Sequence, residues 1–250
     1  MAYLDPPKES TKEALQSLKD DNVNVKIFTG DNEAVTRAIA LQVGLNVDTV
    51  YDGEQIEAAT SEEMAKIVEK CDIFVHLTPE LRTKIINALQ KNGHIVGYMG
   101  DGNKDTLAMK VADVTVTSNN AVDITKESAD IILEQKDLQL LEEMIITGRK
   151  VFSNTMKYIK TFLVTNFGSV ITMVVASIIL PFLPLLPLQL LILDLLYSIS
   201  CLVIPFDSVS RSYVKKPQQW SIRKWPKFMF SFGPIPAIVD FIMMALMFYV

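Results

Sequence analysis

Two aspartates stand four residues apart in residues 97–105, whose sequence is Gly-Tyr-Met-Gly-Asp-Gly-Asn-Lys-Asp. The apolar run 94–99 predicts a short buried strand that breaks at Gly100, and a helical pattern follows. In α/β folds the carboxyl ends of parallel strands bind ligands. Carboxylates there suit Mg²⁺, which takes one or two of them together with water and phosphate oxygens. Asp101 and Asp105 are therefore candidate magnesium ligands, although these residue types also suit an ordinary turn.

A second junction between a strand and a helix has the sequence Thr29-Gly30-Asp31-Asn32. Weak alternation over 23–28 predicts a strand, and residues 33–43 predict a helix closed by a glycine. A small hydroxyl and free backbone N–H groups at a helix amino terminus form a good phosphate site. The alternative is an ordinary connection in which an acidic or amide side chain caps the helix. The sequence leaves these two interpretations evenly matched.

A third candidate is Arg82, near the start of a helix predicted over 80–91, after a strand predicted over 73–77. Proline at position 79 suits the first turn of that helix. From there Arg82 can point at the same sheet edge as Thr29 and Asp101, although a lone arginine is more often a solvated surface charge. For His76 and His94, which have unrelated spacings, packing or capping is the favoured role.

The elements that must position these residues alternate between strand and helix. The remaining predictions are a helix from Ser10 or Thr11 to about Lys19, a polar loop over 51–60, a helix over 62–70, a helix to 111, strands over 114–117 and 131–133 separated by a loop, and a helix from 138. This alternation predicts an α/β fold with a parallel sheet and right-handed crossovers.

Hydrophobic residues make up 49% of the 250-residue chain but are unevenly spread, because residues 161–193 contain no Asp, Glu, Lys or Arg. This shift divides the chain into a soluble half and an all-α membrane half. The net charge of -5 argues against nucleic acid as a partner. The two cysteines fall in different halves, so neither a disulfide framework nor a zinc site is expected. The polar, proline-bearing amino terminus predicts no signal peptide.

Three membrane spans are predicted, at about 161–180, 188–204 and 228–250, with prolines forcing a turn between the first two. Basic residues flank the start of the first span and the end of the second: Lys157, Lys160, Arg211, Lys215, Lys216, Arg223, Lys224 and Lys227. The proline turn has no charge. The positive-inside rule then predicts that both ends of this hairpin are cytoplasmic.

Several polar residues lie within the spans, among them Asp194 in the second and Asp240 in the third. A carboxylate in mid-membrane costs on the order of 2.5–3.5 kcal/mol, which makes it a functional candidate. Asp194 is expected to face the first span and share a site with Asn166. The alternative is a contact that only holds the helices together; for Asp194 function is favoured.

The order of these motifs resembles the carboxyl half of P-type ATPases, which have a haloacid-dehalogenase-like phosphorylation domain. The motifs are Asp-Pro-Pro-Lys, Thr-Gly-Asp-Asn, Thr-Pro-x-x-Arg and Gly-Asp-Gly-x-x-Asp, then a stalk helix into a membrane hairpin. Residues 121–133, 166–168 and 202–207 look like the bacterial magnesium-transporting branch. The resemblance implies a partial phosphorylation domain over 1–147, a stalk over 148–160 and a transmembrane region over 161–250.

The resemblance also implies roles. Asp101 binds the catalytic Mg²⁺ and Asp105 supports that site. Thr29, Gly30 and Asp31 hold the phosphoryl group, and Arg82 stands where the family has a lysine that contacts it. Further implied positions are Asp5 at the hinge toward the nucleotide domain, and Asn166 and Asp194 in the helices that line the cation site. The implied cofactor is Mg²⁺, with ATP as substrate of the complete enzyme, in a multi-pass protein of the bacterial plasma membrane whose soluble half is cytoplasmic.

Departures from the family pattern are equally specific. The Asp-Lys-Thr-Gly-Thr motif of the phosphorylated aspartate is absent, and the nucleotide-binding domain, actuator domain and earlier membrane helices would precede Met1. Lys104 stands where asparagine is usual, and Leu107 where proline is usual. The ammonium of Lys104 is expected to compete with the metal. Ser198 stands where an acid is usual, one turn after Asp194.

Three functions follow in order of preference. The first is the carboxyl-terminal portion of an ATP-driven cation transporter, with magnesium as the expected ion and the lipid bilayer and the missing amino-terminal domains as partners. The second is a non-catalytic fragment or degenerate copy that associates with a full-length transporter. The third, a membrane-anchored phosphatase, ranks last because the chain has no Asp-x-Asp nucleophile motif.

Overall fold

The computed structural model describes residues 10–135, 137–181, 185–218 and 220–249. Its chain divides into two units, Met1–Met144 and Ile145–Val250, which we call the α/β unit and the helical unit. Each is considered by itself. Asp5, expected at a hinge, lies outside the described residues. The functional division into a phosphorylation domain, a stalk and a membrane region stays a prediction.

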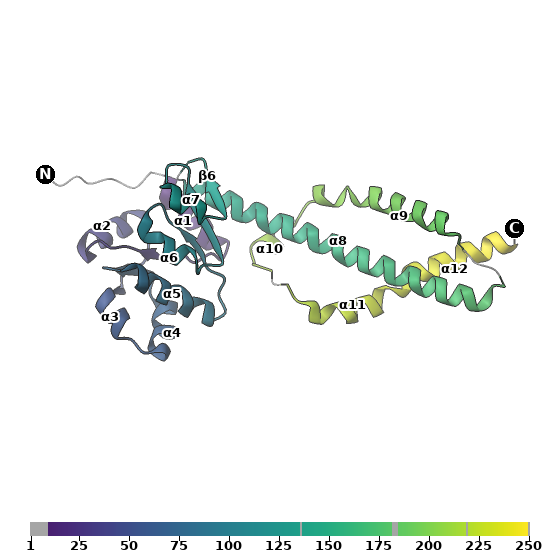
Figure 1. Ribbon diagram of the computed structural model, residues 1–250, viewed down its shortest axis with the longest axis horizontal. Coiled ribbons are helices and arrows are strands. Elements are labelled where there is room, and N and C mark those ends of the chain that lie inside the picture. Colours follow the sequence, from purple (N-terminus) through teal and green to yellow (C-terminus); the bar gives the residue numbers. More distant parts are fainter. Residues whose placement is uncertain (1–9, 136, 182–184, 219, 250) are drawn as a thin grey trace. The chain divides into compact units, whose positions relative to one another are not determined.

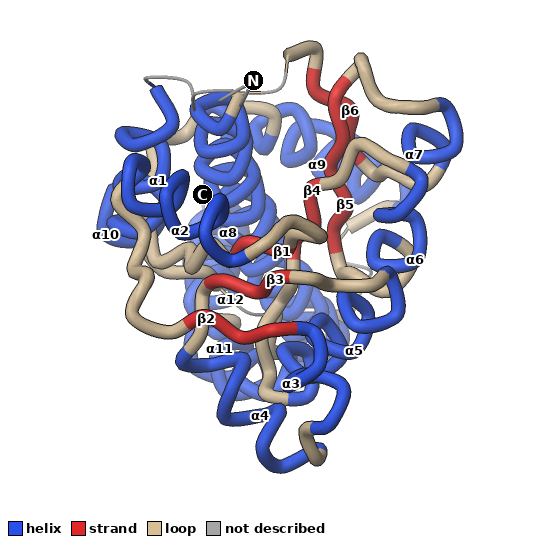
Figure 2. Tube along the Cα trace, turned by 90° about the vertical axis from the view of Figure 1, so that its left-hand side faces the viewer, coloured by secondary structure: helices blue, strands red, loops and turns tan. Residues whose placement is uncertain are grey.

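Six parallel strands form the framework of the α/β unit, which confirms the α/β class (Figure 2). They are grouped into two three-stranded sheets, not into the single sheet that the alternation predicts. One sheet has the order β1–β3–β2, with β1 at Ile27–Phe28, β3 at Ile73–Val75 and β2 at Val50–Asp52. The other has the order β4–β5–β6, with β4 at Gly97–Met99, β5 at Val114–Ser118 and β6 at Ile131–Leu133.

The two sheets are separate because β1 and β4 each have one strand neighbour among the described residues. The backbone of β1 bonds to β3, and that of β4 bonds to β5. Instead of a ladder, ring packing links the two edge strands, since the Phe28 and Tyr98 ring centroids lie 6.1 Å apart. The predicted strands 23–28 and 94–99 are also shorter than expected, and each keeps only its last residues.

Helices follow the strands, largely as predicted (Figure 1). They are α1 Ser10–Asp20, α2 Glu33–Val43, α3 Gly53–Ala58, α4 Ser61–Lys70, α5 Pro79–Lys91, the 3₁₀ turn η1 Asn103–Asp105, α6 Thr106–Met109 and α7 Asp123–Glu127. The Asn32 side chain caps α2 by accepting from the Val35 N–H at 3.0 Å. Gly44 ends the same helix with φ at 82°, a conformation that favours glycine.

Two predicted loops are wrong. Residues 51–60 form β2 and α3, because Asp52 and Gln55 make a reciprocal capping box and Ile56 is fully buried against the core. Residues between β5 and β6 include α7, whose Thr125 is fully buried. Both helices have only one or two core residues, so their apolar periodicity is too short to be seen in sequence.

The core of the α/β unit lies around β3, whose three residues are all fully buried. Phe74 packs with Ile85 of α5 and Val68 of α4 on one side. Ile73 and Val75 pack with Ala40 of α2 on the other. A strand covered by helices on both faces holds its carboxyl end in place, and so fixes the neighbouring end of β1.

The helical unit confirms three stretches long and apolar enough to cross a membrane, at Leu138–Ile179, Pro187–Phe206 and Trp225–Leu246. The first is α8, a single helix of 42 residues. The second contains α9, Pro187–Cys201, which ends three residues earlier than predicted, and η2, Ile204–Phe206. The third is interrupted at Gly233, which separates α11, Trp225–Phe232, from α12, Pro234–Tyr249. Two short helices, α10 Arg211–Val214 and η3 Ile222–Lys224, lie between.

Candidate functional site

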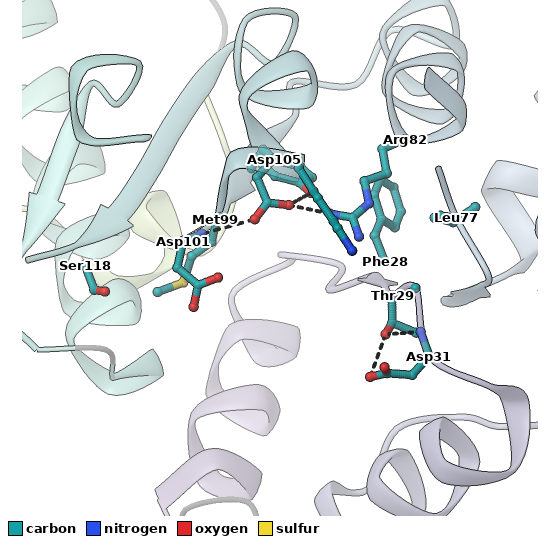
Figure 3. A pocket seen from close by; sticks show the side chains of 13 residues that line it. Phe28, Thr29, Asp31, Leu77, Arg82, Met99, Asp101, Asp105 and Ser118 are labelled. Atoms are coloured by element: carbon teal, nitrogen blue, oxygen red, sulfur yellow. Dashed lines mark hydrogen bonds and ion pairs between the residues drawn. The ribbon is translucent and has the colours of Figure 1, made fainter. Parts of the chain in front are cut away.

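One cavity of about 390 Å³ collects the predicted residues of the α/β unit (Figure 3). Its lining includes all six residues assigned to phosphate or metal: Thr29, Gly30, Asp31, Arg82, Asp101 and Asp105. They come from the ends of β1 and β4 and from the first turns of α5 and η1. The cavity therefore lies between the two open sheet edges, where β1 and β4 each lack a second strand neighbour among the described residues.

The loop after β1 is closed on itself. The Thr29 hydroxyl accepts from the Asp31 N–H at 3.0 Å and donates to the Asp31 carboxylate at 3.1 Å. The backbone of Thr29 continues the ladder, because its N–H donates to Phe74 O and its carbonyl accepts from the Leu77 N–H, both at 3.0 Å. A short polar loop held to the buried strand β3 presents its hydroxyl and carboxylate at the cavity.

Asp105 is held by four donors. Its Oδ1 accepts from the Arg82 guanidinium and from the Tyr98 hydroxyl, the latter at 2.8 Å. Its Oδ2 accepts from the backbone N–H groups of Asp101 and Gly102, both at 3.2 Å. Because both of its oxygens accept hydrogen bonds, the Asp105 carboxylate holds the loop after β4 in place. Direct contact with a metal requires Asp105 to give up one of these donors.

Glycine is required where β4 ends. A Cβ atom at Gly100 would lie 2.5 Å from the Cβ of Asp105, closer than such atoms approach. The Gly100 carbonyl accepts from the buried Thr117 hydroxyl of β5 at 2.7 Å. The close approach of backbone and carboxylate thus explains the first glycine of the Gly-Asp-Gly sequence.

Arg82 is 8% exposed, and its Nε is a buried nitrogen with no hydrogen-bond partner among the described residues. The same guanidinium donates to Asp105 and, at 3.2 Å, to the Tyr98 hydroxyl. The interpretation of Arg82 as a solvated surface charge is therefore wrong. A buried cation with an unused donor at a cavity suits an anionic group such as phosphate.

Tyr98 is the residue that the sequence reasoning missed. Burial raises the pKa of its hydroxyl, and the hydrogen bond to Asp105 raises it further. The hydroxyl is therefore a donor at neutral pH and fixes Asp105 against Arg82. The only feature of the sequence that could have indicated it is a hydroxyl-bearing side chain inside a strand that is otherwise predicted to be apolar and buried.

Asp101 and Lys104 are both exposed at the cavity. Figure 3 shows the Asp101 carboxylate directed away from Asp105. No cluster of three or more His, Cys, Asp or Glu side chains is found in the described part of the chain. An exposed carboxylate at Asp101, in the same cavity as the Thr29–Asp31 loop, fits a cation that takes few protein carboxylates and completes its shell with water and phosphate oxygens, as Mg²⁺ does.

In the helical unit the expected pair does not form. The exposed Asn166 side chain donates to Phe162 O of its own helix at 2.9 Å, and Asp194 is exposed on α9. No hydrogen bond or ion pair joins the two, both of which are described residues. Their role at a cation site stays a prediction that this conformation does not support by contact.

Known proteins resemble the whole chain. A family described as haloacid dehalogenase-like hydrolase matches residues 1–113. The "Magnesium-transporting ATPase, P-type 1" proteins of Salmonella typhimurium and Escherichia coli are 46% and 45% identical over all 250 residues. The "Calcium-transporting ATPase" of Bacillus subtilis is 31% identical over 77% of the chain and 22% of its own length. The catalytic domain of a CPx-ATPase, a solved structure, is 28% identical over 55% of the chain and 45% of its own, with a TM-score of 0.42.

The chain spans 28% of the length of these magnesium-transporting relatives. The match nevertheless extends over both units, from the strand-end motifs around the cavity to the apolar helices. With a haloacid dehalogenase-like region and 46% identity over all 250 of its own residues, the chain belongs to the P-type ATPase family.

Proposed function

We propose that this chain supplies the magnesium and phosphate side of a phosphoryl-transfer site, together with membrane helices, in an ATP-driven transporter of Mg²⁺. The observation that supports this most is the convergence of six motif residues on one cavity. The names of the magnesium-transporting relatives support the choice of ion. Phosphoryl transfer needs positioning and charge stabilisation more than covalent chemistry, and these residues can supply both.

Each group has a distinct role in this proposal. Asp101 holds the metal, and Asp105 orients the loop that presents it. The Thr29-Gly30-Asp31 loop positions the phosphoryl group, and the Arg82 guanidinium neutralises part of its charge. When bound, Mg²⁺ draws negative charge from the transferring group.

The phosphorylated aspartate must come from another segment of the complete transporter, since this chain has no Asp-Lys-Thr-Gly-Thr motif. We therefore expect no ATP hydrolysis by the chain alone. Acid-stable incorporation of label from ATP into the purified chain would contradict this assignment.

Binding of Mg²⁺ and inorganic phosphate tests the site directly. Calorimetry on the full chain in lipid nanodiscs is expected to show phosphate binding that requires Mg²⁺. Asp101→Asn should abolish the magnesium dependence, whereas Asp123→Asn, which removes an almost fully exposed carboxylate of α7, should change nothing. Equal loss in both variants, or none in Asp101→Asn, would refute the site.

The membrane part carries a separate orientation prediction. Basic residues before the first span and after the second favour a cytoplasmic position for both ends of the hairpin. A cysteine introduced at Leu185 should react with an impermeant reagent from the outside only. Labelling from the cytoplasmic side alone would show that the hairpin has the opposite orientation. In the complete transporter, Asp194→Asn is expected to insert normally but to lose transport.

A further inference from the structure

Asp240 of α12 and Thr172 of α8 meet inside the helical unit. The Thr172 Oγ1 lies 3.1 Å from the Asp240 Oδ2 and 3.1 Å from the carbonyl oxygen of Gly168. Thr172 is 2% exposed, and Asp240 is half-buried. This is the carboxylate contact that the structure provides between spans, in contrast to the expected pair of Asn166 and Asp194.

The close crossing of α8 with the third span makes this contact. A Cβ atom at Gly168 would lie 2.8 Å from the Gly233 carbonyl oxygen and 3.0 Å from the Pro236 side chain. Thr172 is one helical turn beyond Gly168, and Asp240 is one turn beyond Pro236. Glycine therefore brings the two backbones together at one turn, and the polar pair follows at the next.

Both residues lie at similar depth in the apolar stretches. Thr172 is twelve residues beyond Lys160, and Asp240 is thirteen beyond Lys227. At 1.5 Å per residue these positions are about 18 and 20 Å from the last basic residue. The hydrocarbon core of a bilayer is about 30 Å thick, so the pair is well inside it.

No counter-charge is available in the neighbouring sequence. The chain has no Lys, Arg or His over 161–210 or over 228–250. The cations nearest in sequence are Lys160 of α8, which lies over the Phe228 ring, and Lys227 at the start of α11. Both stand at the start of their apolar stretches, and α9 carries Asp194, Tyr197 and Cys201. An ionised Asp240 would have a single hydroxyl donor from the described residues, at a depth where an isolated charge is unfavourable.

The hydrogen bonds of Thr172 can all be made at once when Asp240 carries a proton. Thr172 has one hydroxyl hydrogen and cannot donate to both of its neighbours at once. If Asp240 carries a proton, its O–H donates to the Thr172 Oγ1 and the Thr172 hydroxyl donates to the Gly168 carbonyl. Both hydroxyl hydrogens then have an acceptor, and no charge remains on Asp240.

We propose that Asp240 is a proton-binding site within the membrane, held by Thr172 where α8 crosses α12. The bound ligand is a proton, and the chain of donors runs from the Asp240 carboxyl through Thr172 to the Gly168 carbonyl. Because the proton is held at a helix crossing, any change in that crossing changes its binding. This inference does not depend on the phosphate site.

Infrared spectroscopy of the full chain in lipid nanodiscs tests the site, because a protonated carboxyl absorbs at higher frequency than a carboxylate. At about pH 7.5, well above the usual range for aspartate, the wild type should show a protonated-carboxyl band that Asp240→Asn removes. Thr172→Val should keep that component but shift it to higher frequency through loss of a hydrogen bond. Thr172→Ser should restore the wild-type position.

Asp194→Asn is the matched control, since it removes the other span carboxylate and should leave the component sensitive to Thr172 unchanged. An unaltered protonated-carboxyl band in Asp240→Asn would show that Asp240 is ionised and overturn the proposal. So would a band whose frequency does not respond to Thr172→Val. These measurements need neither ATP nor Mg²⁺, so they stand apart from the test of the proposed function.

Discussion

The α/β unit and the helical unit hold their buried carboxylates by different means. Asp105 is surrounded by two backbone N–H groups, a hydroxyl and a guanidinium. Asp240 has one threonine among the described residues and no cation nearby in sequence. The first acid accepts hydrogen bonds from four donors, whereas the second contacts one hydroxyl.

In both units a glycine allows a close approach of the backbone that a Cβ atom would prevent. Gly100 allows the backbone to approach Asp105, and Gly168 allows α8 to approach Gly233 and Pro236. The comparison predicts that adding a single methyl group at either position disturbs the carboxylate site more than the rest of the unit.

Gly100→Ala is expected to have the largest effect. Its Cβ would meet Asp105 at 2.5 Å, so the loop must shift, at a cost of about 1–3 kcal/mol in free energy of unfolding, and Mg²⁺ binding should be lost. Urea denaturation and calorimetry measure the two effects. Gly30→Ala in the same cavity has nothing within 4 Å of its Cβ and should stay within about 0.5 kcal/mol of wild type. Similar losses of unfolding free energy and of Mg²⁺ binding in both variants would mean that the close contact between Gly100 and Asp105 is unimportant.

Gly168→Ala should have a smaller net effect in the helical unit. The added Cβ clashes with Gly233 and Pro236, but alanine favours helix by up to about 1 kcal/mol and offsets part of the cost. Gly148→Ala in the same helix has open space at its Cβ and should be stabilising. Thermal unfolding of the helical signal in lipid compares the two. A stabilising Gly168→Ala would argue against the close crossing that positions Asp240.

Lys104→Asn is expected to tighten Mg²⁺ binding. The Lys104 ammonium is exposed in the cavity that holds Asp101, so its removal should lower the dissociation constant roughly two- to tenfold, in keeping with the modest energies of exposed charges. Calorimetry at low and high salt should show the gain shrinking as salt rises. Lys110→Asn, on an exposed lysine outside the cavity lining, is the control. Unchanged or weaker binding in Lys104→Asn would count against Asp101 as the metal ligand.

The smallest expected effect is on the pH dependence of stability, through the ion pair of His76 with Asp52, which lies outside both sites. The His76 ring bonds to Asp52 at 2.5 Å and holds the pKa of Asp52 below its ordinary value of 3.8, helped by the Glu54 N–H. A lowered folded pKa gives stability that is present above 3.8 and is lost as pH falls through the folded value. Because Asp52 is exposed, Asp52→Asn should remove only about 0.5 kcal/mol of the acid sensitivity between about pH 5 and pH 3. An identical acid profile in the variant would show that the pair is inert.

The sequence predicted more of the site in the α/β unit than in the helical unit, and the reason is physical. Thr29 and Asp101, which follow strands, and Arg82, in the first turn of α5, could be predicted to share a site. Parallel strands followed by helices bring the carboxyl ends of the strands to one edge. The boundaries of α2 and α5 followed from Asn32, Gly44 and Pro79, which act within one turn of chain.

In the helical unit, composition alone determined that three stretches can cross a membrane, since length and hydropathy are local properties. The sequence did not predict which faces of those helices meet. Apolar residues lie on every face, so hydrophobic periodicity does not distinguish a packed face from a lipid-facing one. Only the tertiary structure placed Thr172 against Asp240 and left Asn166 and Asp194 apart. It alone also separated the strands into two sheets and closed Tyr98 and Arg82 on Asp105, because such contacts depend on packing between segments distant in sequence.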